Sequence, residues 1–331
     1  MKVSIIIPAY NVAPFITHTL SSLKTDDDIE HEIIVINDGS TDQTASVISE
    51  YIENSTQNIK FINQINSGVS AARNAGINAA IGEFIIFLDG DDFVENGYIS
   101  ELYTAAINNS CEIVTCMYNH IWENGEKVSK NFDKYMKMPN LFTWEQFLQT
   151  FLYNTTMINT GSLLFKLSII KDNNLRFDET MTHCEDHKFF VDCFIKANKV
   201  YHIKKILYNY LQRSGSLTHN AKPIAYTDTV VFYFNLLKDT RFKQFVSEKT
   251  EQIVSIYSIP QAIEYLLRYF IITDKQDLFN QYFSEFKARK YFINRSITLK
   301  ISIPFKMRLY SLYIAFFTSC YKKRIKRLFG R

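Results

Sequence analysis

The stretch FIIFLDGDDF, residues 84–93, decides the fold. Its apolar run, Phe84 to Leu88, predicts a buried strand. The turn that follows is crowded by three carboxylates, those of Asp89, Asp91 and Asp92. Carboxylates this close repel one another and raise one another's pKa, so the turn needs a compensating cation. Clustered carboxylates suit hard cations that prefer oxygen ligands, and we expect a divalent metal ion here, with a solvated acidic turn as the alternative.

Other short runs rich in β-branched and aromatic residues occur nearby, at 2–8, 32–37, 59–63 and 112–117. Patterns typical of helices lie between the strands, at 15–23, 42–53, 71–80 and 98–108. Strands that alternate with helices in units of about 25–30 residues predict a mostly parallel sheet flanked by helices, which is an α/β fold. Ligands of such sheets bind at the carboxyl ends of the strands.

Polar turns follow the first four predicted strands at this edge: Pro8-Ala9-Tyr10-Asn11, Asn37-Asp38-Gly39-Ser40, Asn66-Ser67-Gly68 and the acidic turn. Each has a plainer interpretation when taken alone. The segment from Asp38 to Asp42 could be a turn with a helix cap, and Asn66 to Gly68 an ordinary turn with glycine at positive φ. Arg73, which follows them, could be a solvated surface charge. Together the turns predict one binding site.

Composition and charge narrow the class of protein. Of 331 residues 47% are hydrophobic, including 27 Phe and 20 Tyr, which indicates a folded chain of one or two domains. Five cysteines without metal-binding spacing favour a reduced, cytoplasmic protein. We find no signal-peptide cleavage site and no uninterrupted apolar run of the roughly 18 residues that a spanning helix needs, so we do not expect an integral membrane protein.

The four turns resemble, in order, the motifs of the family 2 glycosyltransferases, which have the Rossmann-like GT-A fold. The matching segments are PAYN (8–11), NDGSTD (37–42), NSGVSAARNAG (66–76) and DGDD (89–92). The resemblance covers about the first 215 residues, and four ordered motifs make it specific. It implies a nucleotide-sugar donor across the strand ends and a divalent ion, Mn²⁺ or Mg²⁺, on the donor's diphosphate.

The resemblance also assigns residues. The implied donor-binding residues are Pro8, Ala9, Tyr10, Asn11, Asp38, Gly68, Arg73, Asp89, Asp91 and Arg213. Ala9 and Tyr10 would line the pocket for base and ribose, and Asp38 would hydrogen-bond the base. Gly68 and Arg73 would shape the nucleotide wall. Asp89 and Asp91 stand as the DxD motif, with Asp91 the chief metal ligand and Asp92 beside it.

A later segment, CEDHKFF (184–190), looks like the ED motif of the family. It implies that Asp186 is the general base, with Glu185 as the substitute. The alternative is a pair of acids that only favours a helix N-terminus. Arg213 and His219 stand where family members carry an Arg or His beside the diphosphate, so His219 is a further candidate ligand, although it could equally be a surface histidine.

The implied reaction is inverting transfer of a sugar, from a uridine donor by family habit, to a glycan or lipid-linked saccharide. The chain resembles bacterial enzymes of capsule, O-antigen or lipooligosaccharide synthesis. Two alternatives are a sugar-phosphate nucleotidylyltransferase, which would need a Gly-rich, Arg-containing loop where PAYN stands, and an inactive sugar-nucleotide-binding scaffold. The presence of both Asp91 and Asp186 argues against the scaffold.

Residues 221–331 predict a second, helical module after a catalytic domain over 1–220, with helical periodicity at 223–238, 241–256 and 260–272. Residues 286–331 carry 13 Lys or Arg and no Asp or Glu, whereas the net charge of the whole chain is +3. Apolar residues recur at helical spacing within 304–331, so we expect an amphipathic tail that binds an anionic membrane surface at the inner face of the cytoplasmic membrane. A helix packed on the second module is the alternative, and nucleic acid is the less favoured partner.

Overall fold

The computed structural model describes residues 1–23, 29–128, 136–154, 158–181, 183–213 and 223–272. The chain divides into two units, of which the first ends at Asn220 and the second begins at Ala221. The amphipathic tail expected at 304–331 lies outside the described residues, and so does His219.

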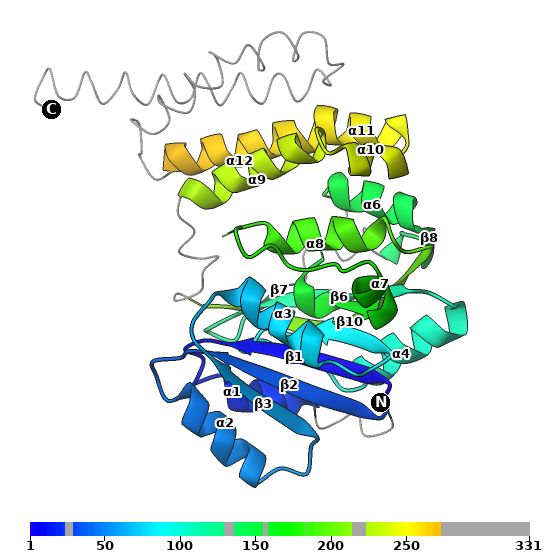
Figure 1. The fold of residues 1–331 in the computed structure, drawn as a ribbon. Coiled ribbons are helices and arrows are strands. Elements are labelled where there is room, and N and C mark those ends of the chain that lie inside the picture. The colour runs from blue at the N-terminus through cyan, green and yellow to red at the C-terminus, as the bar shows by residue number, and fades with distance from the viewer. Residues whose placement is uncertain (24–28, 129–135, 155–157, 182, 214–222, 273–331) are drawn as a thin grey trace, which may run out of the picture. The chain divides into compact units, whose positions relative to one another are not determined.

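The first unit is built on one mixed sheet with the strand order β3-β2-β1-β4-β9-β6-β10-β5 (Figure 1). Its strands are β1 (Val3–Ala9), β2 (His31–Asp38), β3 (Ile59–Gln64), β4 (Phe84–Phe87), β5 (Phe93–Val94), β6 (Ile113–Trp122), β7 (Lys127–Val128), β8 (Leu141–Thr143), β9 (Leu163–Lys166) and β10 (Lys199–Gln212). The first four strands along the chain run parallel to one another, as the sequence predicts. The α/β fold class is therefore confirmed.

One strand interrupts the parallel pattern. β9 lies between β4 and β6 and runs antiparallel to both. The sequence did not predict this strand. Its four residues, LLFK, are too few to show the period of a strand.

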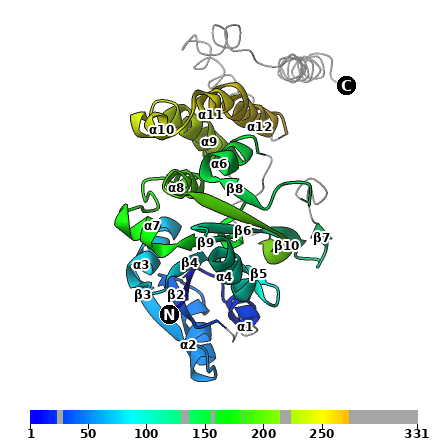
Figure 2. The same ribbon diagram turned by 90° about the vertical axis from the view of Figure 1, so that its right-hand side faces the viewer.

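Helices cover both faces of the sheet, which explains why the parallel strands are apolar on both sides. The helices are α1 (Ile16–Ser22), α2 (Thr44–Glu53), α3 (Val69–Ala79), α4 (Tyr98–Asn109), α6 (Trp144–Leu152), α7 (Leu167–Asp172) and α8 (Glu185–Phe194), with a short 3₁₀ turn, η2 (Thr160–Ser162). Ile5 and Ile7 of β1 belong to a core shared with α1, α2 and α4. Ile6, which points the other way, faces α3. Figure 2 shows α3 and α1 on opposite sides of the strands.

Strand register brings the predicted turns together. Ala9 pairs with Asn37, and Asp38 pairs with Gln64, so the ends of β1, β2 and β3 lie level. Leu88 donates its backbone N–H to the Ile6 carbonyl at 2.9 Å, which places the acidic turn beside the end of β1. The carboxyl edge of the sheet thus carries every turn that the sequence singled out.

The second unit is helical over its described part. Its elements are α9 (Pro223–Leu236), α10 (Thr240–Phe245), α11 (Glu248–Ile253), the π-helical turn η3 (Val254–Ser258) and α12 (Ile259–Ile272). The single helix expected at 241–256 is broken because Val246 is extended. Asp239 caps α10 by accepting the backbone N–H of Arg241 at 2.8 Å. Within the described part of the chain, every helix is too short or too polar to cross a bilayer.

Candidate active site

The turns after β1 and β2 are bound to each other through Asn11. This residue has a positive φ of 52°, and its side-chain oxygen accepts the backbone N–H of Thr41 at 2.8 Å. Its own backbone N–H donates to Ser40 Oγ at 3.1 Å. The side chain of Asn11 therefore shapes the wall of the expected pocket. Contact of Asn11 with a donor stays a prediction.

The other residues of the first turn differ in exposure. Tyr10 is 47% exposed, so its ring can offer a face to a nucleotide base. Ala9 is 1% exposed and Pro8 is partly buried. Stacking on Tyr10 is the contact in this turn that the geometry allows most readily.

Asp38 lies at the end of β2 and is 3% exposed. Its Oδ1 accepts Gln64 Nε2 at 2.7 Å and the backbone N–H of Ser67 at 2.9 Å, and its Oδ2 accepts the backbone N–H of Gly68 at 2.9 Å. Gly68 has a φ of 90°, which favours glycine, and precedes α3. A carboxylate has about four acceptor positions, so these donors leave room for one more, such as a ring N–H of a base.

Arg73 joins two acidic motifs. Its Nη2 lies 2.9 Å from Asp89 Oδ1, and its Nη1 lies 3.2 Å from Glu185 Oε1, a residue 112 positions along the chain. Its side chain is 5% exposed, so the interpretation of Arg73 as a solvated surface charge is wrong. Burial lowers the pKa of Arg73, but the charges of Asp89 and Glu185 outweigh burial and keep it a cation. The sequence did not predict this bridge.

The three carboxylates of the acidic turn have three different sets of partners. Asp89 pairs with Arg73, and Asp91 Oδ2 lies 2.5 Å from Arg213 Nε. Arg213 follows β10 directly, and its guanidinium carbon lies 5.1 Å from the centre of the Phe15 ring. Two arginines of the chain itself thus provide the positive charge that the turn was expected to need.

Asp92 is fully buried and faces the protein. Its carboxylate accepts the hydroxyl of Tyr208 and, at 2.8 Å, the backbone N–H of Leu211, both on β10. Burial, and then the charges of Asp91 and Asp89, raise the pKa of Asp92 well above its usual value. Its oxygens therefore anchor β10 to the acidic turn, and a place for Asp92 beside the metal stays a prediction.

Tyr208 is a further site residue that the sequence did not reveal, since a tyrosine in an aromatic strand gives no local signal. Its ring lies against Gly161 of η2, where a Cβ would come 2.4 Å from Tyr208 Cε2. Thr160, the neighbour of Gly161, directs its hydroxyl to Asp89 Oδ2 at 3.4 Å. The segment TGS (160–162) therefore touches the acidic turn.

Asp89 and Asp91 fit a divalent cation. Their side chains are 27% and 16% exposed, so both can be reached, and both supply the oxygen ligands that Mg²⁺ and Mn²⁺ prefer. Burial and the charge of Asp89 raise the pKa of Asp91 despite Arg213, which indicates that more positive charge would be favourable there. Among the described residues, no group of three or more His, Cys, Asp or Glu is arranged as a complete metal site, so any ion would need ligands from the donor or solvent as well.

The ED pair opens α8. Glu185 Oε1 is bound to Arg73, whereas Asp186 Oδ1 accepts the backbone N–H of His187 at 2.8 Å. No ion pair involves Asp186 in the part of the chain that the structure describes. Burial, and then the charge of Asp186, raise the pKa of Glu185 to about 7, although Arg73 opposes the rise. The two acids therefore differ: Glu185 is bound to Arg73, whereas Asp186 is bound to a backbone amide, and its role as the base stays a prediction.

Comparison with known proteins shows the family of the chain. The model of the family described as Glycosyl transferase family 2 matches residues 4–172. This chain belongs to glycosyl transferase family 2.

Individual relatives also match the chain. The chain is 33% identical over 218 residues to the uncharacterized glycosyltransferase EpsJ of Bacillus subtilis, an alignment that covers 65% of this chain and 62% of that protein. It is 30% identical over 227 residues to the glycosyltransferase GlyA of Streptococcus pneumoniae, covering 66% of this chain and 31% of that protein. The alignments thus span less than two thirds of the length of these two relatives.

Solved structures share the fold. Residues 1–349 of Staphylococcus aureus TarS, in complex with UDP-GlcNAc, match with a TM-score of 0.63 and 21% identity, covering 81% of each chain. The mannosyltransferase PcManGT of Pyrobaculum calidifontis, in complex with GDP-Man and Mn²⁺, matches with a TM-score of 0.58 and 15% identity, covering 100% of this chain and 88% of that one. At these identities the likeness concerns the GT-A fold.

The raised pKa of Glu185 leads to a prediction about stability. Its usual value is 4.5, so between pH 4.5 and about 7 the folded protein binds more protons at this site than the unfolded chain does. Stability contributed by this group therefore falls as pH rises through that window. We expect the unfolding free energy of the wild type, relative to Glu185→Gln, to fall by about 1–3 kcal/mol between pH 4.5 and 7.5 in urea titrations. A difference that is independent of pH would contradict this assignment.

Proposed function

We propose that the chain is an inverting glycosyltransferase that moves a sugar from a UDP-sugar to a hydroxyl of a glycan or lipid-linked saccharide in the synthesis of a bacterial surface polysaccharide. The observation that carries the proposal is the Arg73 bridge. One guanidinium contacts both Asp89 of the DxD turn and Glu185 of the ED pair. The turn proposed to bind the donor and the ED pair, which contains the proposed base, therefore meet at one side chain.

In this proposal the donor lies along the carboxyl edge, with its base on Tyr10 and at Asp38. Gly68 and Arg73 form the wall beyond them. Asp91, with Asp89, would hold a Mn²⁺ or Mg²⁺ ion, and a bound ion supplies positive charge to the diphosphate leaving group. Arg213, which already lies at Asp91, is a second positive charge within reach of that group.

Transfer with inversion is a single displacement. The acceptor oxygen bonds to the anomeric carbon as the bond from that carbon to the diphosphate breaks, and the bonding pair leaves with the diphosphate. Asp186 accepts the proton of the acceptor hydroxyl. This scheme needs one base and no protein nucleophile, which agrees with a single ED pair whose Glu185 is engaged by Arg73.

The choice of donor and polymer is supported by relatives. TarS of Staphylococcus aureus, named a poly(ribitol-phosphate) beta-N-acetylglucosaminyltransferase, is 26% identical over 214 residues and covers 63% of this chain. Its fragment 1–349 was crystallised with UDP-GlcNAc. TarS has the same fold, a polymer substrate and a uridine donor. We therefore favour a uridine donor and a polymer acceptor for this chain as well.

The direct test is incubation with a panel of nucleotide sugars and Mn²⁺, with detection of the released nucleoside diphosphate. We expect slow hydrolysis or transfer of one UDP-sugar. Binding without turnover of any donor would favour a scaffold. Release of pyrophosphate from a nucleoside triphosphate and a sugar phosphate would favour a nucleotidylyltransferase.

Asp186→Asn tests the base. The variant should lose transfer by about 10²- to 10⁴-fold, because an amide cannot accept the hydroxyl proton. Donor affinity, measured by calorimetry, should stay nearly unchanged, since a general base acts on the acceptor. Asp172→Asn, an exposed acid at the end of α7, is the control and should behave as the wild type. Loss of donor binding in Asp186→Asn would instead make Asp186 a donor ligand and Glu185 the candidate base.

Asp91→Asn tests the metal. Activity should require Mn²⁺ or Mg²⁺ and disappear in excess EDTA. The variant should lose most turnover and bind the donor more weakly when metal is present, because it removes a carboxylate ligand and its charge. Full activity in EDTA would exclude the metal-dependent mechanism.

The predicted tail, residues 304–331, would hold the enzyme on the cytoplasmic membrane near a lipid-linked acceptor. Each basic residue near an anionic leaflet contributes about 1 kcal/mol, so a cluster of five or six suffices for reversible binding. We expect the full chain to sediment with anionic vesicles at low salt and to be released at high salt. A chain ending at residue 303 should remain in the supernatant. Equal sedimentation of both proteins would show that the tail is not the anchor.

A further inference from the structure

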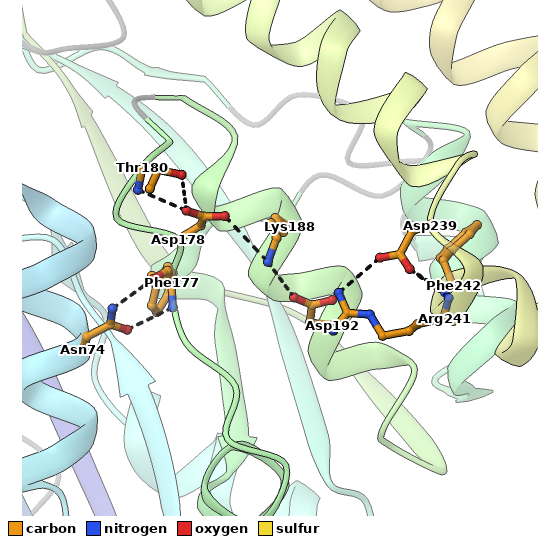
Figure 3. A network of polar contacts seen from close by, with 9 residues as sticks. All are labelled: Asn74, Phe177, Asp178, Thr180, Lys188, Asp192, Asp239, Arg241 and Phe242. Carbon is orange, nitrogen blue, oxygen red and sulfur yellow. Dashed lines mark hydrogen bonds and ion pairs between the residues drawn. The ribbon is translucent and has the colours of Figure 1, made fainter.

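Asn74 of α3 makes a two-point contact with a distant backbone. Its Nδ2 donates to the Phe177 carbonyl, and its Oδ1 accepts the Phe177 N–H, both at 2.9 Å and across 103 positions of sequence (Figure 3). Nδ2 also donates to Glu179 Oε1 at 2.8 Å. The side chain is buried, and both hydrogens of its amide are used. In a strand, the N–H and C=O of Phe177 would bond to the backbone of a neighbouring strand. Here both groups bond to the side chain of Asn74 instead.

The backbone that Asn74 holds has no regular structure. Residues 173–181 connect α7 to the approach of α8, so their buried polar groups need other partners. On the far side of this segment, Asp178 accepts the Thr180 hydroxyl at 2.6 Å, and Lys188 Nζ lies 4.0 Å from Asp178 Oδ2 (Figure 3). The long Lys188 contact is partly exposed and weak. Arg176 of the segment also donates to Asn78 of α3 at 3.2 Å, but that contact is exposed, so the buried attachment to α3 is the one to Asn74.

The side chain of Phe177 transmits this attachment to the acidic motifs. Its ring stacks on Phe189 of α8, with centroids 3.9 Å apart and planes 13° apart. The Arg73 guanidinium carbon lies 5.1 Å from the same ring. Phe189 lies one helical turn after Glu185, on the same side of α8. Phe177 thus touches both the helix that carries the ED pair and the arginine that joins this pair to Asp89.

α3 itself has little freedom to move on the sheet. A Cβ at Gly76 would lie 2.1 Å from Ile6 Cγ2, so the helix contacts β1 directly through its backbone. Ile6 is fully buried. Two neighbouring side chains of this fixed helix therefore have different partners. Arg73 contacts the two acidic motifs, and Asn74 contacts segment 173–181.

We propose that Asn74 is a positioning residue for the transfer reaction: by holding Phe177, it fixes the first turn of α8, and hence Asp186, relative to the metal turn. This inference rests on the proposed function. Asn74 touches neither the acidic turn nor the ED pair in any contact that we find among the described residues. It acts through Phe177, and its loss should misplace the base while the donor turns keep their shape.

Two single variants and a double variant test the proposal. Asn74→Ala removes the whole contact. Asn74→Asp keeps an acceptor for the Phe177 N–H but sets a second oxygen against the Phe177 carbonyl and the Glu179 carboxylate. Asn74→Asp with Glu179→Gln restores one bond with its direction reversed, because the glutamine amide can donate to the new carboxylate. Asn78→Ala is the matched control, since Asn78 is an exposed residue of α3 that accepts a side-chain bond from the same segment, Arg176 Nη2 at 3.2 Å, and its loss leaves the backbone contacts of Phe177 in place.

The kinetic readout separates positioning from general damage to the fold. With the donor sugar found in the panel, kcat for transfer should fall about 10- to 100-fold in both single variants, as a displacement near 1 Å can cost 10². The KM for the donor and the calorimetric affinity for its nucleoside diphosphate should stay within about twofold of the wild type. The double variant should recover at least part of kcat, and Asn78→Ala should retain all of it. A donor KM that rises with the loss of kcat, or a double variant no better than Asn74→Asp, would overturn the proposal.

Hydrogen exchange checks the same inference without activity. In Asn74→Ala, the amide of Phe177 and its neighbours in 173–181 should exchange faster, while β1 and β2 exchange as in the wild type. Unchanged exchange in 173–181 would show that Asn74 does not hold the segment. If the wild type transfers no sugar, the proposed function fails; if it does and the variants keep its kcat, only the positioning role fails.

Discussion

The arrangement of the site depends on one buried cation. Arg73 is 4% exposed and lies between Asp89 and Glu185. A buried guanidinium without partners would be strongly destabilising. Both carboxylates share this one cation. Removing Arg73 would leave Asp89 and Glu185 without the positive charge between them, which makes this triad a constraint on where α8 can lie. The acidic turn and the ED pair are joined through it.

The sequence was sufficient to predict the fold class and the edge of the sheet that carries the site. Short runs of β-branched and aromatic residues are local properties of the sequence. They predict β1, β2, β3, β4 and β6, from residues 2–8, 32–37, 59–63, 84–88 and 112–117. The turn residues at Asp38, Gly68 and Asp89 were found for the same reason, because each directly follows its strand. Antiparallel β9 could not be found in this way. Its place between β4 and β6 is decided by pairing, which a run of four residues, three of them apolar, does not encode.

Long-range polar contacts were the second feature that could not be predicted from the sequence. The sequence indicated that Asp89, Asp91 and Asp92 need a cation, but it could not show that Arg73 and Arg213 supply charge to two of them. Nor could it show that Asp92 is anchored to Tyr208 and Leu211, since those residues lie more than a hundred positions away. Asn74 looked like any polar residue of an amphipathic helix. These roles exist only after the chain has folded.

The place of β9 has a consequence for synthesis of the chain on the ribosome. β4 pairs with β1 on one side, and among the described strands it pairs with residues 163–166 on the other. When the first hundred residues have emerged, the parallel strands can already pair, yet β4 then presents an open edge of four apolar residues, FIIF. Such an edge is a template for pairing with other chains. A nascent chain halted before residue 163 would therefore be prone to aggregate, and any domain cut from this protein must extend beyond β9 to protect itself.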